Sequence, residues 1–150
     1  MQPYRRILIA SDLTEFSEPA LWRANELSRQ YGAELHLLHV IEHFPEDRSN
    51  EWVAPEDRRP SEYVTDRAQD ALDLLAAKLD RPNDDSVKPQ VTTGPHSARH
   101  EIIAYAEENA IDLIVVGAHG PHWRETLTGS TASGVLHHAP CDVLVVRAAQ

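Results

Sequence analysis

The sequence predicts an α/β fold with a single, doubly wound parallel sheet of five strands and four helices. Short apolar runs rich in β-branched residues recur along the 150 residues, as is typical of strands covered on both faces. Between these runs, apolar residues repeat at helical spacing, so expected strands and expected helices alternate. Parallel neighbours need crossover connections, and right-handed crossovers place helices on both faces of the sheet.

The first expected strand is residues 6–10, a buried run that stops at a serine and an aspartate. A helix then begins at Thr14 or Ser17, which are both good N-cap residues, and it ends at Gly32. Alanine and leucine recur at helical spacing inside this segment, which predicts one buried helix face.

The middle of the chain contributes two strands, a long loop and a helix. Residues 35–40 form the second expected strand. Residues 41–60 are polar, contain three prolines and show no clear period, so they are expected to form a long loop. Ser61 is expected to cap the second helix, whose apolar residues form one stripe. Residues 87–93 form the third strand, and Pro89 predicts a sheet edge because proline lacks the N–H that a central strand donates.

The last third of the chain completes the alternation. Ser97 is expected to cap the third helix. Residues 111–116 are a nearly continuous apolar run and form the fourth strand. A short helix over residues 130–138 and an apolar strand over residues 141–147 follow. These elements bring the expected total to five strands and four helices.

A glycine-containing loop after the fourth strand is the strongest functional signal. Gly117 and Gly120 let the backbone turn sharply and approach a ligand without a Cβ in the way. Gly129, Ser130 and Thr131 open the following helix and would direct unpaired N–H groups at an anion. The pattern predicts a phosphate cradle, and the alternative interpretation is two tight turns of an ordinary α/β protein.

Asp12 is the second candidate for ligand contact. It ends the first strand, while Gly117 ends the fourth. If these strands are neighbours where the strand order reverses, the carboxylate and the glycine loop face one crevice, which is where such sheets bind ligands. An equally weighted alternative is that the Asp12 side chain accepts hydrogen bonds from its own backbone and forms a turn.

Charge narrows the range of partners. The formal net charge is −10, the acidic residues concentrate between residues 42 and 85, and no stripe of lysine or arginine offsets them. This distribution repels nucleic acid, so neither DNA nor RNA is an expected partner. It also opposes a free polyphosphate, and Arg124 is the one permanent cation between residues 117 and 129. We therefore expect a bound nucleotide to bring Mg²⁺ with it.

Cysteine and histidine usage excludes several classes of site. Cys141 is the single cysteine, so the chain has neither an intramolecular disulfide nor a CxxC pair, and a cytoplasmic location is expected. No signal peptide or membrane span is recognised. His36 and His39 are three residues apart in a strand and should point to opposite faces, so they cannot share a metal ion.

The chain resembles the universal stress protein family over essentially its whole length. The matching stretches are residues 7–12 (ILIASD), 37–40 (LLHV), 112–120 (DLIVVGAHG), 129–131 (GST) and 138–146 (HAPCDVLVV). The resemblance implies one domain over residues 1–150, strand order 3-2-1-4-5 and a Rossmann-like fold related to the adenine nucleotide alpha hydrolases. It also implies homodimers paired through the last strand.

In one branch of that family, ATP is bound by a G-x2-G-x9-G-[S/T] loop. Carried over to this chain, the resemblance implies two groups of contact residues. Those flanking adenine and ribose are Asp12 and Val40, and those surrounding the phosphates are Gly117, His119, Gly120, Gly129, Ser130 and Thr131. Eight residues separate Gly120 from Gly129, one fewer than in the pattern, and His122 and Trp123 are bulky residues inside this interval.

The leading functional hypothesis is therefore a stress-response regulator that binds ATP. The alternative is a stress protein that binds no nucleotide and acts through its dimer and partner surfaces. An enzyme such as an ATP pyrophosphatase of similar architecture is the least favoured interpretation, because no second catalytic constellation appears. A hydrolytic triad is not indicated either, since no serine has an evident histidine and carboxylate pair in a nucleophile elbow. At most, slow hydrolysis of ATP is expected.

Overall fold

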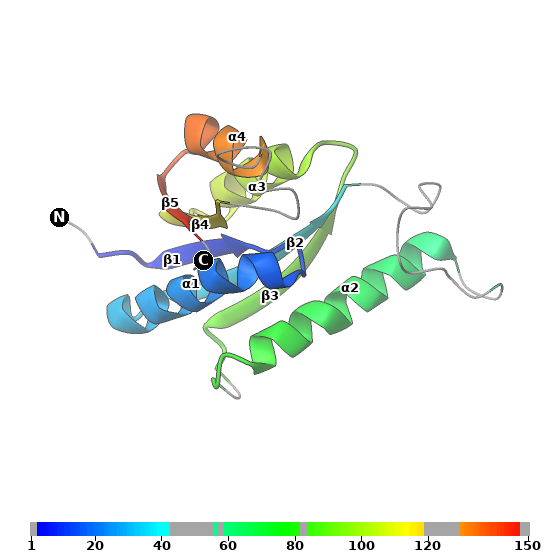
Figure 1. Ribbon diagram of the computed structural model, residues 1–150, viewed down its shortest axis with the longest axis horizontal. Helices are drawn as coiled ribbons and strands as arrows, with labels where there is room; N and C mark the ends of the chain where they lie inside the picture. The colour runs from blue at the N-terminus through cyan, green and yellow to red at the C-terminus, as the bar shows by residue number, and fades with distance from the viewer. Residues whose placement is uncertain (1–2, 43–55, 57–58, 82–83, 119–129, 148–150) are drawn as a thin grey trace.

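The computed structural model describes residues 3–42, 56, 59–81, 84–118 and 130–147 (Figure 1). Its centre is a five-stranded parallel sheet in the order β3-β2-β1-β4-β5, which confirms the expected fold. The strands are β1 (Arg6–Ala10), β2 (Glu34–Ile41), β3 (Val87–Thr93), β4 (Leu113–Gly117) and β5 (Asp142–Val146). β3 lies at one edge, as Pro89 indicated, and β5 lies at the other.

Four α-helices cover the two faces of this sheet. They are α1 (Glu18–Tyr31), α2 (Pro60–Ala77), α3 (Ala98–Glu108) and α4 (Ser130–His138). Figure 1 shows α1 and α2 on one face and α3 and α4 on the other. The sequence alternates strand and helix, so each crossover returns the chain to the same edge of the sheet, and the carboxyl ends of all five strands lie together there.

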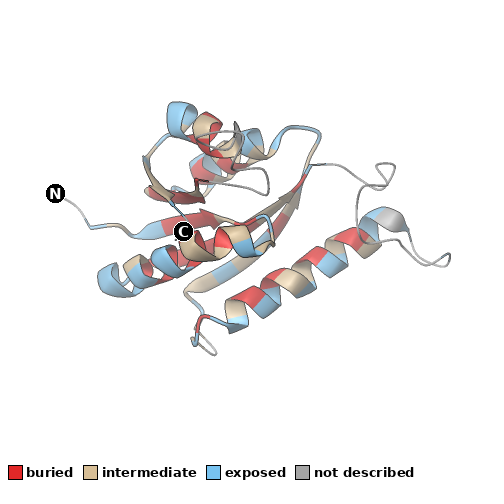
Figure 2. Cartoon of the chain, in the orientation of Figure 1, coloured by how far each residue is buried: buried red, intermediate tan, exposed pale blue. Residues whose placement is uncertain are grey.

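The core consists of two layers, one on each side of the sheet. Ile7 and Ile9 of β1 face the layer formed with α1 and α2, whereas Leu8 between them faces the layer formed with α3 and α4. All three side chains are fully buried. Figure 2 shows the same division, with buried residues along the strands and along the inner stripe of each helix. The alternation follows from the two-residue period of a strand.

The helix starts agree with the expectations at α1 and α3, whose N-caps are Ser17 and Ser97, and differ at α2. A short 3₁₀ turn, η1 (Glu15–Ser17), precedes α1, and the Thr14 hydroxyl caps it by accepting a 3.3 Å bond from the Phe16 N–H. The prediction that Ser61 caps the second helix was wrong. The N-cap of α2 is Arg59, because a proline follows it and proline is favoured in the first turn of a helix.

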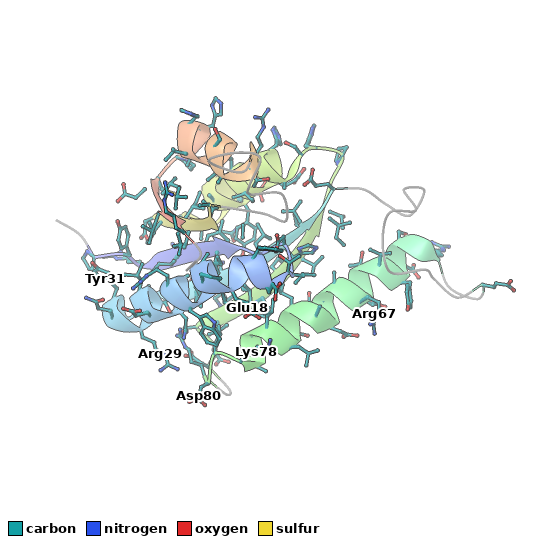
Figure 3. The ribbon with its side chains drawn as sticks, viewed as in Figure 1. Glu18, Arg29, Tyr31, Arg67, Lys78 and Asp80 are labelled. Atoms are coloured by element: carbon teal, nitrogen blue, oxygen red, sulfur yellow. The ribbon has the colours of Figure 1, made fainter. Side chains whose placement is uncertain are left out.

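Arg29 and Lys78 tie the end of α2 to α1 (Figure 3). The Arg29 guanidinium donates to the backbone carbonyls of Leu79 and Asp80 at 3.0 and 3.1 Å. Lys78 Nζ lies 3.4 Å from the carboxylate of Glu18. Asp80 has a positive φ of 54°, a conformation that suits a tight turn after a helix.

A second arginine organises the loop between α2 and β3. The side chain of Arg81 is 9% exposed and binds Asp84 through Nε at 2.8 Å. Its other nitrogens donate to Asn25 Oδ1 at 3.1 Å, Ser28 Oγ at 2.6 Å and Ser86 Oγ at 2.8 Å. Arg81 therefore connects two side chains of the loop, Asp84 and Ser86, to two side chains of α1, Asn25 and Ser28.

Asp84 makes the loop sensitive to acid. Hydrogen bonds from the Ser86 hydroxyl and backbone N–H, and then from Arg81, lower the pKa of Asp84 to about 2. The unfolded chain titrates near the ordinary value of about 3.9, so this stabilisation is complete above that pH. It is lost as the pH falls through the folded value.

We expect the Asp84→Asn variant to lose less stability than the wild type between about pH 4 and pH 2. Urea denaturation midpoints measured across this interval provide the test. Asp70→Asn, which alters an exposed carboxylate of α2, is the matched control and should keep the wild-type pH dependence. Parallel pH curves for the wild type and Asp84→Asn would show that the Asp84 bonds do not contribute to stability.

Candidate functional site

The reversal of strand order brings β1 and β4 together at the carboxyl edge of the sheet. β1 pairs with β2 on one side and with β4 on the other. Asp12 follows the end of β1, Gly117 is the last residue of β4, and Val40 lies near the end of β2. The expected neighbourhood of Asp12 and Gly117 is therefore confirmed at the level of strand order. α4 begins at Ser130.

The Asp12 side chain forms a turn with the backbone that follows it, which is one of the two roles expected from the sequence. Its Oδ1 atom accepts from the Thr14 N–H at 2.9 Å and from the Thr14 hydroxyl at 2.6 Å. Leu13, between them, has a φ of 64°. Asp12 is exposed, and within the described residues its Oδ2 atom makes no hydrogen bond. One carboxylate oxygen thus holds the turn, and the other is available to a ligand.

Two buried serines, Ser11 and Ser17, hold the turn after β1 in place. The Ser17 hydroxyl donates its hydrogen to the Thr14 carbonyl at 3.0 Å. Ser11 Oγ lies 3.0 Å from Ser17 Oγ, and because the Ser17 hydrogen is already used, Ser11 is the donor of this second hydrogen bond. Ser11 Oγ also accepts from the Leu13 N–H at 3.1 Å. Both serines are buried, and their hydrogen bonds hold the backbone of the turn in one conformation.

His39 supports the same turn from β2. Its Nδ1 atom lies 2.8 Å from the Ser11 carbonyl, which can only accept, so Nδ1 carries the proton. Burial lowers the pKa of His39, and the Ser11 hydrogen bond and the Asp12 charge oppose that shift. The imidazole is therefore neutral near pH 7, with Nε2 as an acceptor. Sequence reasoning overlooked this role, although the position of His39 at the carboxyl end of β2 was a usable signal.

His36, the other histidine of β2, points to the opposite face of the sheet from His39, as expected. His36 is buried on the face covered by α3, where Nδ1 lies 2.7 Å from the Tyr105 hydroxyl. Its Nε2 atom lies 3.1 Å from Glu34 Oε2. His36 therefore connects the start of β2 to α3 and is not part of the site at the carboxyl edge.

The remaining predicted site residues divide into two groups. Val40 is half-buried and packs against the core layer of α3 and α4, while Gly117 and Thr131 are half-buried at the end of β4 and in the first turn of α4. Ser130 is the first residue of α4. The other three predicted phosphate contacts lie outside the described residues, so they stay predictions: His119, Gly120 and Gly129.

The described residues contain no group of three or more histidine, cysteine or acidic side chains that could hold a metal ion. None of their helices has the length and apolar character needed to cross a bilayer.

Comparison with known proteins agrees with this architecture. The model of the universal stress protein family matches residues 3–147. Universal stress protein A homolog 1 of Coxiella burnetii is 36% identical over 143 residues, which cover 95% of this chain and 96% of that protein.

Two solved structures show the same fold. Universal stress protein UspA from Lactobacillus plantarum superposes with a TM-score of 0.74 at 29% identity, over 98% of this chain and 100% of the other. A universal stress protein from Archaeoglobus fulgidus in complex with dAMP gives a TM-score of 0.68 at 19% identity, over 96% of this chain and 98% of the other. The match to the family model and the Coxiella relative establish that the chain belongs to the universal stress protein family.

Proposed function

We propose that this chain is a stress-response regulator that binds an adenine nucleotide, ATP with Mg²⁺, in the crevice beyond β1 and β4. The observation that carries the proposal is that β1, which Asp12 follows, pairs with β4, which Gly117 ends, at the point where strand order reverses. Parallel α/β sheets bind their ligands at this point. The dAMP complex of the Archaeoglobus fulgidus neighbour supports an adenine nucleotide as the ligand class.

Each described residue of the crevice has a distinct task in this proposal. The free Oδ2 atom of Asp12 accepts a hydrogen bond from a ribose hydroxyl, and Val40 flanks the adenine. Gly117 lets the backbone approach the phosphates, because it carries no Cβ. The backbone N–H groups at the start of α4, at Ser130 and Thr131, attract the phosphate charge. His119, Gly120 and Gly129 complete the cradle.

We propose that Mg²⁺ enters this site bound to the nucleotide. Since the chain carries a net charge of −10, a nucleotide with a bound divalent cation experiences less repulsion than the free polyphosphate. We propose that nucleotide occupancy is the regulatory signal in the cytoplasm and that any hydrolysis is slow.

Nucleotide binding should stabilise the fold, because a ligand that binds only the folded state adds RT ln(1 + [L]/Kd) to the unfolding free energy. At a hundredfold excess over Kd this is about 2.7 kcal/mol. For a domain of this size the melting temperature should rise by about 5 to 10 °C. Differential scanning calorimetry with ATP and Mg²⁺ is the measurement, and GTP with Mg²⁺ is the control for base recognition.

An unchanged melting temperature across millimolar ATP with Mg²⁺ would contradict nucleotide binding. That outcome would favour the alternative, a stress protein that acts only through dimer and partner surfaces. Equal shifts with ATP and GTP would contradict adenine recognition while leaving a phosphate cradle in place.

We also propose that two copies pair through β5. In this strand Val143 to Val146 are half-buried in the single chain, and on its outer side no described strand pairs with it. The Val146 carbonyl accepts from the Ala118 N–H at 2.8 Å and so points toward β4. Since successive residues of a strand direct their backbone groups to opposite sides, Val143 and Val145 direct theirs to the open edge. The β5 strand of a second copy, related by a twofold axis, would form hydrogen bonds with these backbone groups.

A further inference from the structure

A groove on the outer surface of α3 and α4 has the chemistry of a second binding site. It encloses about 400 Å³ and is lined by Ser97, Arg99, His100, Ile103, Ala104, Glu107 and His138. None of these residues belongs to the predicted nucleotide site. The α3 residues recur every three or four positions from Ser97 to Glu107, so the groove follows one helix face for about 15 Å.

Arg99 is the central cation of this groove. A Cβ at Gly134 of α4 would collide with Cδ of Arg99 and lie 3.2 Å from its Cβ, so the arginine stem packs directly on the glycine. Glycine inside a helix costs about 1 kcal/mol relative to alanine. The close approach of Arg99 gives this glycine a packing role that offsets the cost.

The guanidinium of Arg99 has no carboxylate partner in the part of the chain that the structure describes. Among the described residues Arg99 makes no ion pair, although the chain contains 24 acidic residues. His100 and His138 line the same groove, and the His96 ring lies 4.3 Å from the His100 ring. Glu107 is the one acidic residue of the lining. In a chain of net charge −10, this is a local concentration of cationic and imidazole groups.

We propose that the α3/α4 groove docks an acidic peptide segment of a partner protein. Carboxylates of such a segment would pair with Arg99 and bond to His100 and His138, because a guanidinium binds carboxylates through paired N–H donors. Ile103 and Ala104 offer apolar contact between these groups. A length of about 15 Å accommodates four or five residues of extended chain. The elongated and open form of the groove therefore suits a peptide better than a compact metabolite.

The test is fluorescence anisotropy at low salt with a labelled peptide of four glutamates and one leucine. A peptide in which glutamines replace the glutamates is the ligand control. We expect the acidic peptide to bind and the neutral one not to bind. Arg99→Gln should weaken binding by about tenfold, because it removes a charged hydrogen-bonding group. Equal binding of both peptides, or no binding of the acidic one, would overturn the proposal.

Arg67→Gln is the matched protein control. Arg67 lies on α2, on the opposite face of the sheet from the groove, and Arg67→Gln makes the same change in net charge (Figure 3). Its peptide affinity should stay within about twofold of the wild type, since remote exposed charges interact weakly. Equal loss of affinity in Arg67→Gln and Arg99→Gln would show attraction by net charge alone and would overturn the assignment to the groove.

Gly134→Ala tests how Arg99 is positioned. The added Cβ must displace the arginine stem, so peptide affinity should fall while the protein stays folded, as circular dichroism would confirm. In the double variant with Arg99→Gln, the alanine should cause no further loss, because its effect acts through Arg99. Additive losses would contradict this positioning. All variants should keep the wild-type response to ATP, which separates this test from that of the nucleotide site.

Discussion

Arg81→Ala should lower the free energy of unfolding by about 3 kcal/mol and the melting temperature by about 6 to 12 °C. The side chain is 9% exposed, so its hydrogen bonds are shielded from water. The substitution removes the donor to Asn25 Oδ1 and the donor to Ser28 Oγ, whose own hydrogen bond to the Asn25 backbone carbonyl remains; both residues are buried on α1. A buried polar group without a hydrogen-bond partner destabilises the folded state by the full free energy of its desolvation.

Arg23→Ala is the control for arginine removal in general. Arg23 and Glu26 form an ion pair at 3.2 Å on α1, with side chains 51% and 65% exposed. This variant should change the unfolding free energy by no more than about 0.5 kcal/mol. Chemical denaturation of both variants is the measurement. Similar, small effects in both would contradict the role of Arg81 as the connection between α1 and the loop before β3.

Val145→Pro should convert the proposed homodimer to a folded monomer. The N–H of Val145 points to the open edge of β5, so proline removes a donor from the dimer ladder and leaves the hydrogen bonds to β4 in place. Analytical ultracentrifugation across micromolar concentrations is the measurement. The wild type should sediment as a dimer and the variant as a monomer.

Val145→Thr is the control for the side chain at this position, because threonine keeps the N–H and the β-branched shape. It should remain dimeric. A wild type that stays monomeric on concentration would contradict pairing through β5. A Val145→Pro variant that remains dimeric would place the interface elsewhere.

Local patterns were sufficient to predict the elements of this fold. Each buried strand is a contiguous apolar run, and Pro89 marked the edge strand from a single missing N–H. The order of the strands came from the family resemblance, because periodicity does not determine which strands are neighbours. The start of α2 was missed because two local signals compete there: Pro60, which is favoured in the first turn of a helix, and Ser61 directly after it, which is a good N-cap residue.

The connections between distant segments were not accessible from sequence patterns. Arg81 binds Asn25 and Ser28, which precede it by more than fifty residues. The spacing of apolar residues within a segment cannot predict a contact between segments so far apart. The spacing of His36 and His39 excluded a shared metal ion but did not indicate what His39 does, because its support of the turn after β1 requires knowing that β2 and β1 are neighbours. The packing of Arg99 on Gly134 likewise depends on the contact between α3 and α4.

Nucleotide binding is measured most directly by equilibrium dialysis of the purified protein against ATP with Mg²⁺. Bound nucleotide would be identified by mass spectrometry after denaturation. We expect one adenine nucleotide per chain for the wild type and loss of binding in a folded Gly129→Val variant, whose side chain would block the phosphates. Absence of bound nucleotide from the wild type at millimolar ATP would contradict nucleotide binding, and full retention by Gly129→Val would contradict the phosphate cradle.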